Sequence, residues 1–277
     1  MAGVAVRADA RTQSSGAPAV QDRFASNPLF QPLREFGYDG LEAWAWDNYK
    51  PTILAFASQA CLRRGKPARL IEIGGGRDPL FTPEEALSKG IAVTVNDIDA
   101  NELAQAPQAF QRAQFDVAGD LERQGAVTGV YDLIVSRMVL EHVVDVPRAW
   151  ANMRALLAPG GVALAFVPTL YAPPFLINKS IPEAVSARLL RTFFPRRHAG
   201  IQPKFPARYE WCFGDQRKLE PMLAAAGFSQ TLVLPFWTHG YFRRLPLLRE
   251  MDSAVQHLAR ARDWRGLTTY AYVLVRK

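Results

Sequence analysis

The feature that most constrains the fold is an alternation of short apolar runs with helical segments between residues 69 and 167. Apolar runs with the length of buried strands occupy 69–73, 91–95, 131–135 and 161–167, and a further strand is expected to end near Phe115. Helical patterns lie between them, at 83–89 and 146–157. Because strand and helix alternate, we expect an α/β fold with a doubly wound, mostly parallel sheet.

Residues that could bind a ligand follow the first two predicted strands. Glu72 to Gly76 reads E-I-G-G-G, and Asp97 follows the second strand 25 residues after Glu72. Glycines let a backbone turn tightly and let a ligand approach, and a carboxylate in this place can accept hydrogen bonds from both hydroxyls of a ribose. The pattern therefore predicts a nucleoside-containing cofactor. Pro79 stands where the dinucleotide fingerprint requires glycine or alanine, which disfavours a dehydrogenase.

The next helix begins late. Thr82, Pro83 and Glu85 have the pattern of a capping box with proline in the first turn. A longer loop than usual therefore separates the first strand from its helix, so help from a helix dipole is not expected at the glycines.

Four motifs in order carry a resemblance to a known family. They are RLIEIGGGRDP at 69–79, VTVNDID at 93–99, YDLIVSRMVLEHVVD at 131–145 and LLAPGG at 156–161. Together they resemble the motifs of class I S-adenosylmethionine-dependent methyltransferases, in particular the small-molecule, type 11-like group. The resemblance implies a Rossmann-like, seven-stranded sheet whose last strand is antiparallel. The runs at 232–236 and 269–275 suit its last two strands.

The resemblance also assigns residues to the cofactor S-adenosyl-L-methionine. It implies that Asp97 holds the ribose hydroxyls, that Ile98 packs on the adenine and that Asp116 binds the adenine amino group, with Asp120 as the alternative. The remaining implied cofactor residues lie after the first and fourth strands: Glu72, Gly74, Gly75, Gly76, Ser136, Arg137 and Met138.

His142 is the expected catalytic residue. It follows Glu141 in an acid-histidine pair that the resemblance places at the mouth of the crevice, and an imidazole can act as a general base near neutral pH. The alternative is that His142 only hydrogen-bonds locally and shapes its turn. His198 and His239 are further candidates. The sequence spacing indicates no metal site.

Charge is unevenly distributed along the chain. Residues 1–168 carry 16 Lys and Arg against 19 Asp and Glu, whereas residues 169–277 carry 17 against 7. The C-terminal part is therefore expected to face something anionic: a phosphorylated or carboxylated substrate, a membrane surface or nucleic acid. A-P-P-F at 172–175 superficially resembles a motif of amino-methylating nucleic-acid enzymes, but it follows the wrong strand and begins with alanine, so nucleic acid is disfavoured.

Domain organisation follows from these patterns. We expect a disordered tail over 1–23 and one methyltransferase domain over 24–277, with a cofactor-binding core at 68–168 and a basic substrate lid inserted at 169–215. Within the lid, Ile181, Val185, Leu189 and Phe193 recur at helical spacing, which suits a helix that packs on the core, covers a pocket or contacts a membrane surface.

The functional expectation is methyl transfer to a small acceptor that is anionic, sugar-linked or lipid-linked. A catalytically inactive cofactor-binding interaction module and a nucleic-acid methyltransferase are the alternatives. Only two cysteines occur, Cys61 and Cys212, and 49% of the residues are hydrophobic, with no unbroken membrane-spanning run. A cytoplasmic location is therefore expected.

Overall fold

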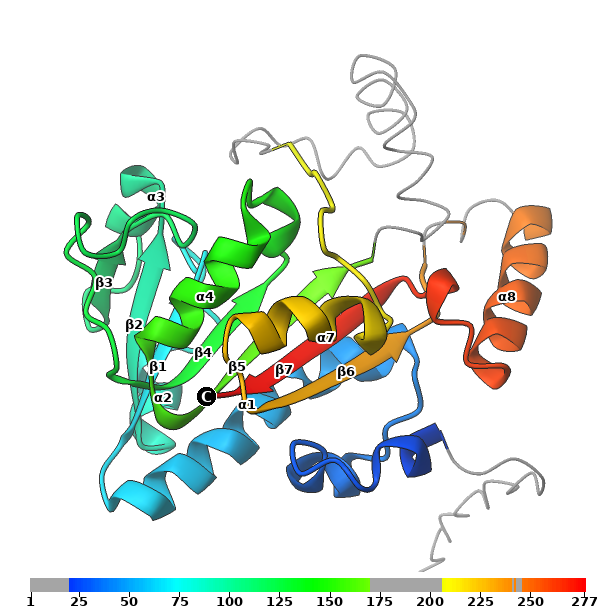
Figure 1. Ribbon diagram of the computed structural model, residues 1–277, viewed down its shortest axis with the longest axis horizontal. Helices are drawn as coiled ribbons and strands as arrows, with labels where there is room; N and C mark the ends of the chain where they lie inside the picture. The colour runs from blue at the N-terminus through cyan, green and yellow to red at the C-terminus, as the bar shows by residue number, and fades with distance from the viewer. Residues whose placement is uncertain (1–19, 170–205, 241, 243–245) are drawn as a thin grey trace, which may run out of the picture.

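The computed structural model describes residues 20–169, 206–240, 242 and 246–277, and its centre is a seven-stranded sheet (Figure 1). The strand order is β3-β2-β1-β4-β5-β7-β6. In chain order the strands are β1 Ala68–Ile73, β2 Ile91–Asp97, β3 Gln111–Gln114, β4 Tyr131–Arg137, β5 Leu157–Pro168, β6 Gln230–Phe236 and β7 Tyr270–Arg276.

The sheet has the expected mixed topology. Strands β1 to β5 pair in parallel, whereas β7 runs antiparallel to both β5 and β6. The predicted α/β class, the doubly wound order and the antiparallel last strand are therefore confirmed. From β1 the chain adds β2 and β3 on one side of the sheet, and it then returns to place β4 on the other side of β1. The switch point, where such sheets bind ligands, therefore lies between β1 and β4.

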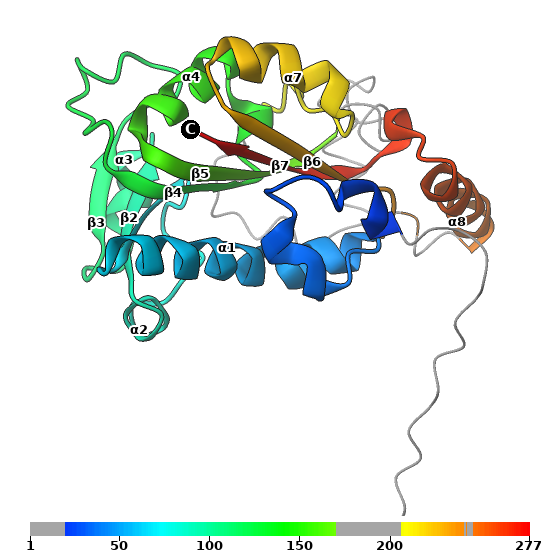
Figure 2. The same cartoon turned by 60° about the horizontal axis from the view of Figure 1, so that its bottom comes forward.

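Helices cover both faces of the sheet. Figure 2 shows α1 (Glu42–Arg64) below it, and α4 (Val146–Leu156) and α7 (Gln216–Ala225) above it. Helix α1 continues through Pro51. The remaining helices are α2 (Pro83–Ser88), α3 (Ala100–Ala104) and α8 (Pro246–Ala261).

The start of α2 matches its prediction. The Thr82 side chain accepts from the Glu85 N–H, and the Glu85 side chain accepts from the Thr82 N–H, which is a complete capping box. Helix α2 begins ten residues after β1 ends, so the expected long loop is present. That loop carries the glycines.

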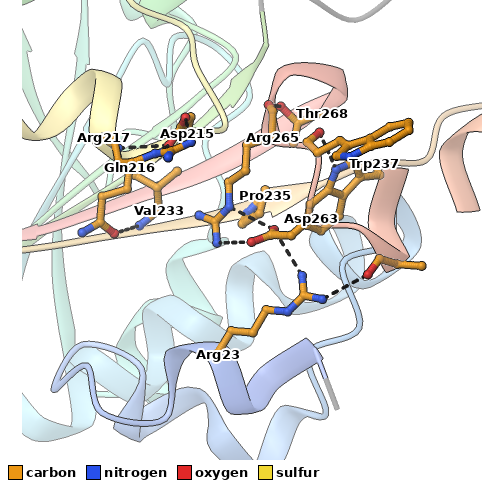
Figure 3. Close-up of polar contacts among 12 residues, drawn as sticks. Arg23, Asp215, Gln216, Arg217, Val233, Pro235, Trp237, Asp263, Arg265 and Thr268 are labelled. Carbon is orange, nitrogen blue, oxygen red and sulfur yellow. Dashed lines mark hydrogen bonds and ion pairs between the residues drawn. The ribbon is translucent and has the colours of Figure 1, made fainter. Parts of the chain in front are cut away.

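Residues 20–23, expected in the tail, instead form the 3-10 helix η1 (Val20–Phe24) of the folded domain. Figure 3 shows the guanidinium of Arg23 directed at Asp263, which also pairs with Arg265 of the 3-10 helix η5 (Arg265–Leu267). The buried ring of Phe24 packs edge-on against Tyr38, which follows the 3-10 helix η2 (Gln31–Phe36). Residues 1–19 and most of the expected lid, 170–205, lie outside the described residues.

Candidate active site

The glycine loop after β1 packs tightly on its neighbours. Gly74 has φ +69°, and a Cβ at this position would lie 2.5 Å from Cγ2 of Val139, in the segment after β4. Gly76 has φ +47°, and a Cβ there would lie 2.9 Å from Oδ2 of Asp97. The Gly75 N–H donates to the carbonyl of Asn96 over 2.9 Å. Both the conformation and the close approach therefore require glycine, and the loop lies against the carboxyl ends of β2 and β4.

Asp97 lies at the end of β2 beside this loop. Its Oδ1 accepts the N–H of Asp99 over 2.9 Å, which fixes the carboxylate, while Oδ2 faces Gly76. Burial raises the pKa of the Asp97 carboxyl from its ordinary value. The next side chain, Ile98, is exposed although it is apolar. A carboxylate beside a glycine loop, followed by an exposed apolar side chain, suits a ribose and an adjoining flat base.

An ion pair that was not predicted from the sequence joins the glycine loop to α3. Arg77 of the glycine loop donates to both carboxylate oxygens of Glu102 on α3, with Nε 2.5 Å from Oε2. The side chain of Glu102 also lies beside Gly76. No motif contains this pair, because it depends on how the long loop folds back onto α3. The pair holds the loop against the element that follows Asp97.

Asp116 and Asp120 occupy different environments after β3. Asp116 is half-buried, and its Oδ1 accepts the N–H of Ala118 over 2.8 Å. Asp120 is exposed and pairs with Arg123 at 3.4 Å. The Asn96 side chain donates to the carbonyl of Phe115, which ties the β3 end to the β2 end. Asp116 is therefore the more buried of the two carboxylates and lies closer in sequence to the end of β3.

Glu72 lies buried beneath the loop. Its Oε2 accepts the N–H of Leu80 over 2.8 Å, and its side chain lies under Gly75. Burial raises the pKa of Glu72 to about 7, opposed by the Leu80 N–H and by Arg137. Glu72 is thus a buried carboxyl that titrates near neutrality, a property that clusters at functional sites.

The end of β4 and the residues after it lie on the other side of the glycine loop from Asp97. Ser136 is buried, and its carbonyl accepts from the hydroxyl of Tyr49 on α1 over 2.8 Å. Met138 has φ +56°, an uncommon conformation for a residue with a side chain, and its N–H donates to the carbonyl of Phe166. Such strain concentrates at ligand sites. The segment 136–138 therefore lies where the sequence predicts the cofactor.

His142 ends the 3-10 helix η3 (Leu140–His142), which follows this segment. Its Nδ1 lies 3.2 Å from the carbonyl oxygen of Pro206, and its Nε2 lies 3.8 Å from Oε1 of Glu141. The carbonyl of Glu141 accepts the N–H groups of Arg208 and Tyr209. The described end of the expected lid, 206–215, is therefore bound to η3 beside His142.

Glu141 is a second buried carboxyl at the site. Within the described part of the chain its Oε2 has no hydrogen-bond partner, and burial raises its pKa to about 8. The thiol of Cys212 is also buried, and burial together with the Glu141 carboxyl raises the pKa of that thiol. At neutral pH Glu141 is therefore mainly protonated.

This pKa predicts a pH dependence of stability. A carboxyl whose pKa is raised by folding stabilises the fold below its unfolded pKa, near 4.5, and that contribution is lost as pH rises through about 8. Glu141→Gln keeps the shape and cannot ionise. We expect differential scanning fluorimetry to give Glu141→Gln the same melting temperature as the wild type near pH 4, below the unfolded pKa, and a higher one at pH 8.5. If the difference in melting temperature between Glu141→Gln and the wild type were the same at both pH values, the raised pKa assigned to Glu141 would be contradicted.

The other histidine candidates do not join this site. His198 lies outside the described residues. His239 follows β6, two strands beyond β5 across the sheet, and lies 3.4 Å from Asp252 of α8. Burial lowers the pKa of His239 to about 4, so it remains neutral at physiological pH.

An aromatic cluster that was not predicted lies at the same edge of the sheet, and of its three rings only that of Trp46 belongs to an exposed residue. Trp46 of α1 is 44% exposed, and its ring lies edge-on to Phe166 of β5 and Tyr270 of β7. Phe166 lies near the carboxyl end of β5, and Tyr270 pairs with Pro168 at that end. The sequence shows these rings only as scattered aromatics, since strand pairing brings them together.

Residues 46–232, more than half of the chain, match a protein family described as "Methyltransferase domain". A polyketide synthase-nonribosomal peptide synthetase of Aspergillus clavatus is 32% identical over 128 residues, which are 42% of this chain and 3% of that protein.

Two solved structures have a similar fold. The DszA carbon methyltransferase has a TM-score of 0.53 at 14% identity, over 94% of this chain and 60% of that one. The CurJ carbon methyltransferase has a TM-score of 0.50 at 17% identity, over 85% of this chain and 56% of that one. The chain thus spans only part of the length of each of these relatives.

Proposed function

The chain belongs to the methyltransferase domain family, and from this membership we propose that it transfers a methyl group from S-adenosylmethionine to a small acceptor. The family match confirms the predicted resemblance, the enzyme class and the cofactor. The observation that carries the proposal is the contact of the glycine loop with Asp97, where a Cβ on Gly76 would meet the carboxylate.

The side chains at the switch point fit this cofactor. S-adenosylmethionine supplies a methyl group on a positively charged sulfur that is already activated for in-line displacement. We assign Asp97 to the ribose hydroxyls, Ile98 to the adenine face and Asp116 to the adenine amino group. We propose that Gly74, Gly75 and Gly76 let the cofactor approach the loop backbone closely. Ser136, Arg137 and Met138 are proposed to contact the cofactor from the end of β4. Glu72 contributes negative charge beneath the loop when it is ionised.

His142 is proposed as the general base. Its Nδ1 lies 3.2 Å from the carbonyl oxygen of Pro206, which orients the imidazole in the segment that follows β4, and its Nε2 lies 3.8 Å from Oε1 of Glu141. A base held there can take a proton from the acceptor as its attacking atom becomes a nucleophile. The other task of the protein is to bring that atom to attack distance and to exclude water.

The acceptor is proposed to be small, with an anionic group and a sugar-linked or lipid-linked body. The basic C-terminal part supports the anionic group, and the exposed ring of Trp46 beside Phe166 and Tyr270 offers a flat apolar surface for the body. A carbon acceptor activated by neighbouring carbonyls is a second candidate, supported by the names of the two carbon methyltransferases of similar fold. Removing a proton from carbon needs a base, which suits His142.

The ionisation of Glu72 gives this proposal a pH signature. A bound sulfonium favours the ionised carboxylate, so S-adenosylmethionine should bind about tenfold more tightly at pH 8 than at pH 6. S-adenosylhomocysteine lacks the positive charge but shares the other titrating groups, and its affinity should change less. Calorimetry at both pH values tests this, and Glu72→Gln should remove the difference between the ligands. Parallel pH curves for both ligands in the wild-type protein would contradict the role of Glu72.

An acceptor screen tests the activity itself. Purified protein is incubated with methyl-labelled S-adenosylmethionine and with anionic amphiphiles, sugar nucleotides or β-ketoacyl thioesters, and labelled product and S-adenosylhomocysteine are counted. We expect stoichiometric transfer with one of these classes. Label transferred to DNA or RNA would favour the nucleic-acid alternative, and tight cofactor binding without consumption across all acceptors would favour an inactive interaction module.

The reaction is proposed to take place in the cytoplasm, a proposal supported by the unpaired state of Cys61 and Cys212. Among the helices in the described ranges, none combines the length and apolar character needed to span a bilayer.

A further inference from the structure

Helix α8 is amphipathic, but it is attached to the domain through its polar side. Gln256 is buried, and its Oε1 accepts the N–H of His239 over 3.3 Å. Oδ1 of Asp252 lies 3.4 Å from Nε2 of His239, and Arg260 donates to the carbonyl of Asp39 over 2.9 Å. Ala259 is fully buried. These contacts lie along one side of the helix, so its opposite side is directed away from the domain.

The exposed surface of α8 carries an apolar strip beside the exposed polar side chains of Glu250 and His257. Met251 is 62% exposed, Val255 50% and Leu258 44%. Their spacing of four and three residues places them on one face of a helix, and we call them the α8 stripe. Both views show α8 at the periphery of the molecule (Figures 1 and 2). A contiguous apolar stripe on a peripheral helix indicates a binding partner.

We propose that the α8 stripe is the contact surface for a second copy of this chain, with the two α8 helices packed antiparallel. The spacing of the stripe is that of the apolar seam between packed helices. Ala254 and Ala261 flank it and are exposed, so small side chains allow the helices to approach closely.

Charge along the helix supports a second copy as the occupant. Glu250 lies at the N-terminal end of the stripe and Arg262 beyond its C-terminal end, and both are exposed. Antiparallel pairing brings each Glu250 toward the partner's Arg262, twice by symmetry. Arg249 donates to Oε1 of Glu250 only, so Oε2 retains acceptor capacity.

The same charges disfavour an anionic membrane as the occupant. Over residues 246–263, which include Arg262, three arginines are balanced by three acidic residues, Glu250, Asp252 and Asp263. An interfacial helix that binds anionic lipid carries an excess of basic residues, and α8 has none. A surface of mixed charge around an apolar seam suits another protein surface of the same kind.

The interface is expected to be weak. Sixteen residues of helix extend about 24 Å, and one helix pair of that length buries less than the roughly 800 Å² per partner of a stable complex. The protein should therefore exchange between monomer and dimer, with a dissociation constant in the micromolar range.

Sedimentation equilibrium over a wide concentration range tests the proposal. The apparent mass should rise from the 30.8 kDa of one chain toward twice that value. The double variant Val255→Glu/Leu258→Glu should raise the dissociation constant by about tenfold or more, because it buries charge in the seam. Leu87→Glu is the matched control, since Leu87 is 82% exposed on α2, and it should dimerise like the wild type. Circular dichroism melting verifies that each variant is folded.

Charge exchange tests the antiparallel arrangement separately. Glu250→Arg and Arg262→Glu should each weaken the dimer several-fold, and the two together should restore it. A wild-type protein that stays monomeric at every concentration, or a dimer indifferent to Val255→Glu/Leu258→Glu, would overturn the proposal. So would a monomer that co-sediments through the stripe with vesicles of phosphatidylglycerol and phosphatidylcholine.

Discussion

Replacement of His142 by asparagine should lower kcat by about 10² to 10⁴-fold, the usual contribution of a positioned general base. The Nδ1 of the imidazole lies 3.2 Å from the carbonyl oxygen of Pro206, in the segment that follows β4. Asparagine can keep a polar contact there but cannot accept the acceptor's proton. The measurement is steady-state methyl transfer with the acceptor identified by the screen, together with the affinity for S-adenosylmethionine.

The control separates base catalysis from local structure. Affinity for S-adenosylmethionine should stay within a factor of about two, because His142 is assigned to the acceptor and not to the cofactor. His257→Asn replaces an exposed histidine of α8 and should leave kcat unchanged. If His142→Asn retained full kcat, His142 would only shape its turn, which is the alternative left open by the sequence.

Asp97→Ala should weaken S-adenosylmethionine binding by at least about tenfold, equivalent to roughly 1.4 kcal/mol. The substitution removes a carboxylate that is fixed by the Asp99 N–H and faces Gly76. Charge-assisted hydrogen bonds to two ribose hydroxyls would be lost with it. Calorimetric titration measures the change directly.

Two further variants make this result specific. Asp97→Asn keeps the size and the local backbone bond but loses the charge, so its affinity should lie between those of the wild type and Asp97→Ala. Glu220→Ala removes an exposed carboxylate on α7 and should bind as the wild type does. Equal affinity of Asp97→Ala and the wild type would refute the ribose assignment.

Local patterns predicted most of the sheet because most of its strands are largely apolar runs, the exception being the polar β3, Gln111–Gln114. The run 131–135 is apolar apart from Asp132 since β4 is buried in the middle of the sheet, and the order of strand and helix leaves few topologies. The Thr82–Glu85 capping box is equally local, with both partners within four residues. These features depend on neighbours in sequence, and the sequence contains them completely.

The parts of the site that the sequence did not predict depend on distant residues. Arg77 meets Glu102 across 25 positions, and Trp46 meets Tyr270 only after β7 has inserted beside β5. The pKa of Glu72 likewise depends on its burial beneath the loop between β1 and α2. The sequence predicts the length of that loop but not the path that it takes over Glu72. The outward orientation of the α8 stripe could not be inferred either, since an amphipathic pattern does not state which side packs on the domain.

The most direct test of the central claim is a calorimetric titration of the wild-type protein with S-adenosylmethionine, S-adenosylhomocysteine and NADH. The predicted result is saturable one-to-one binding of the first two and no heat from NADH beyond dilution. Binding of NADH with no response to either sulfur ligand would contradict the claim, because the glycine loop and Asp97 would then serve a dinucleotide.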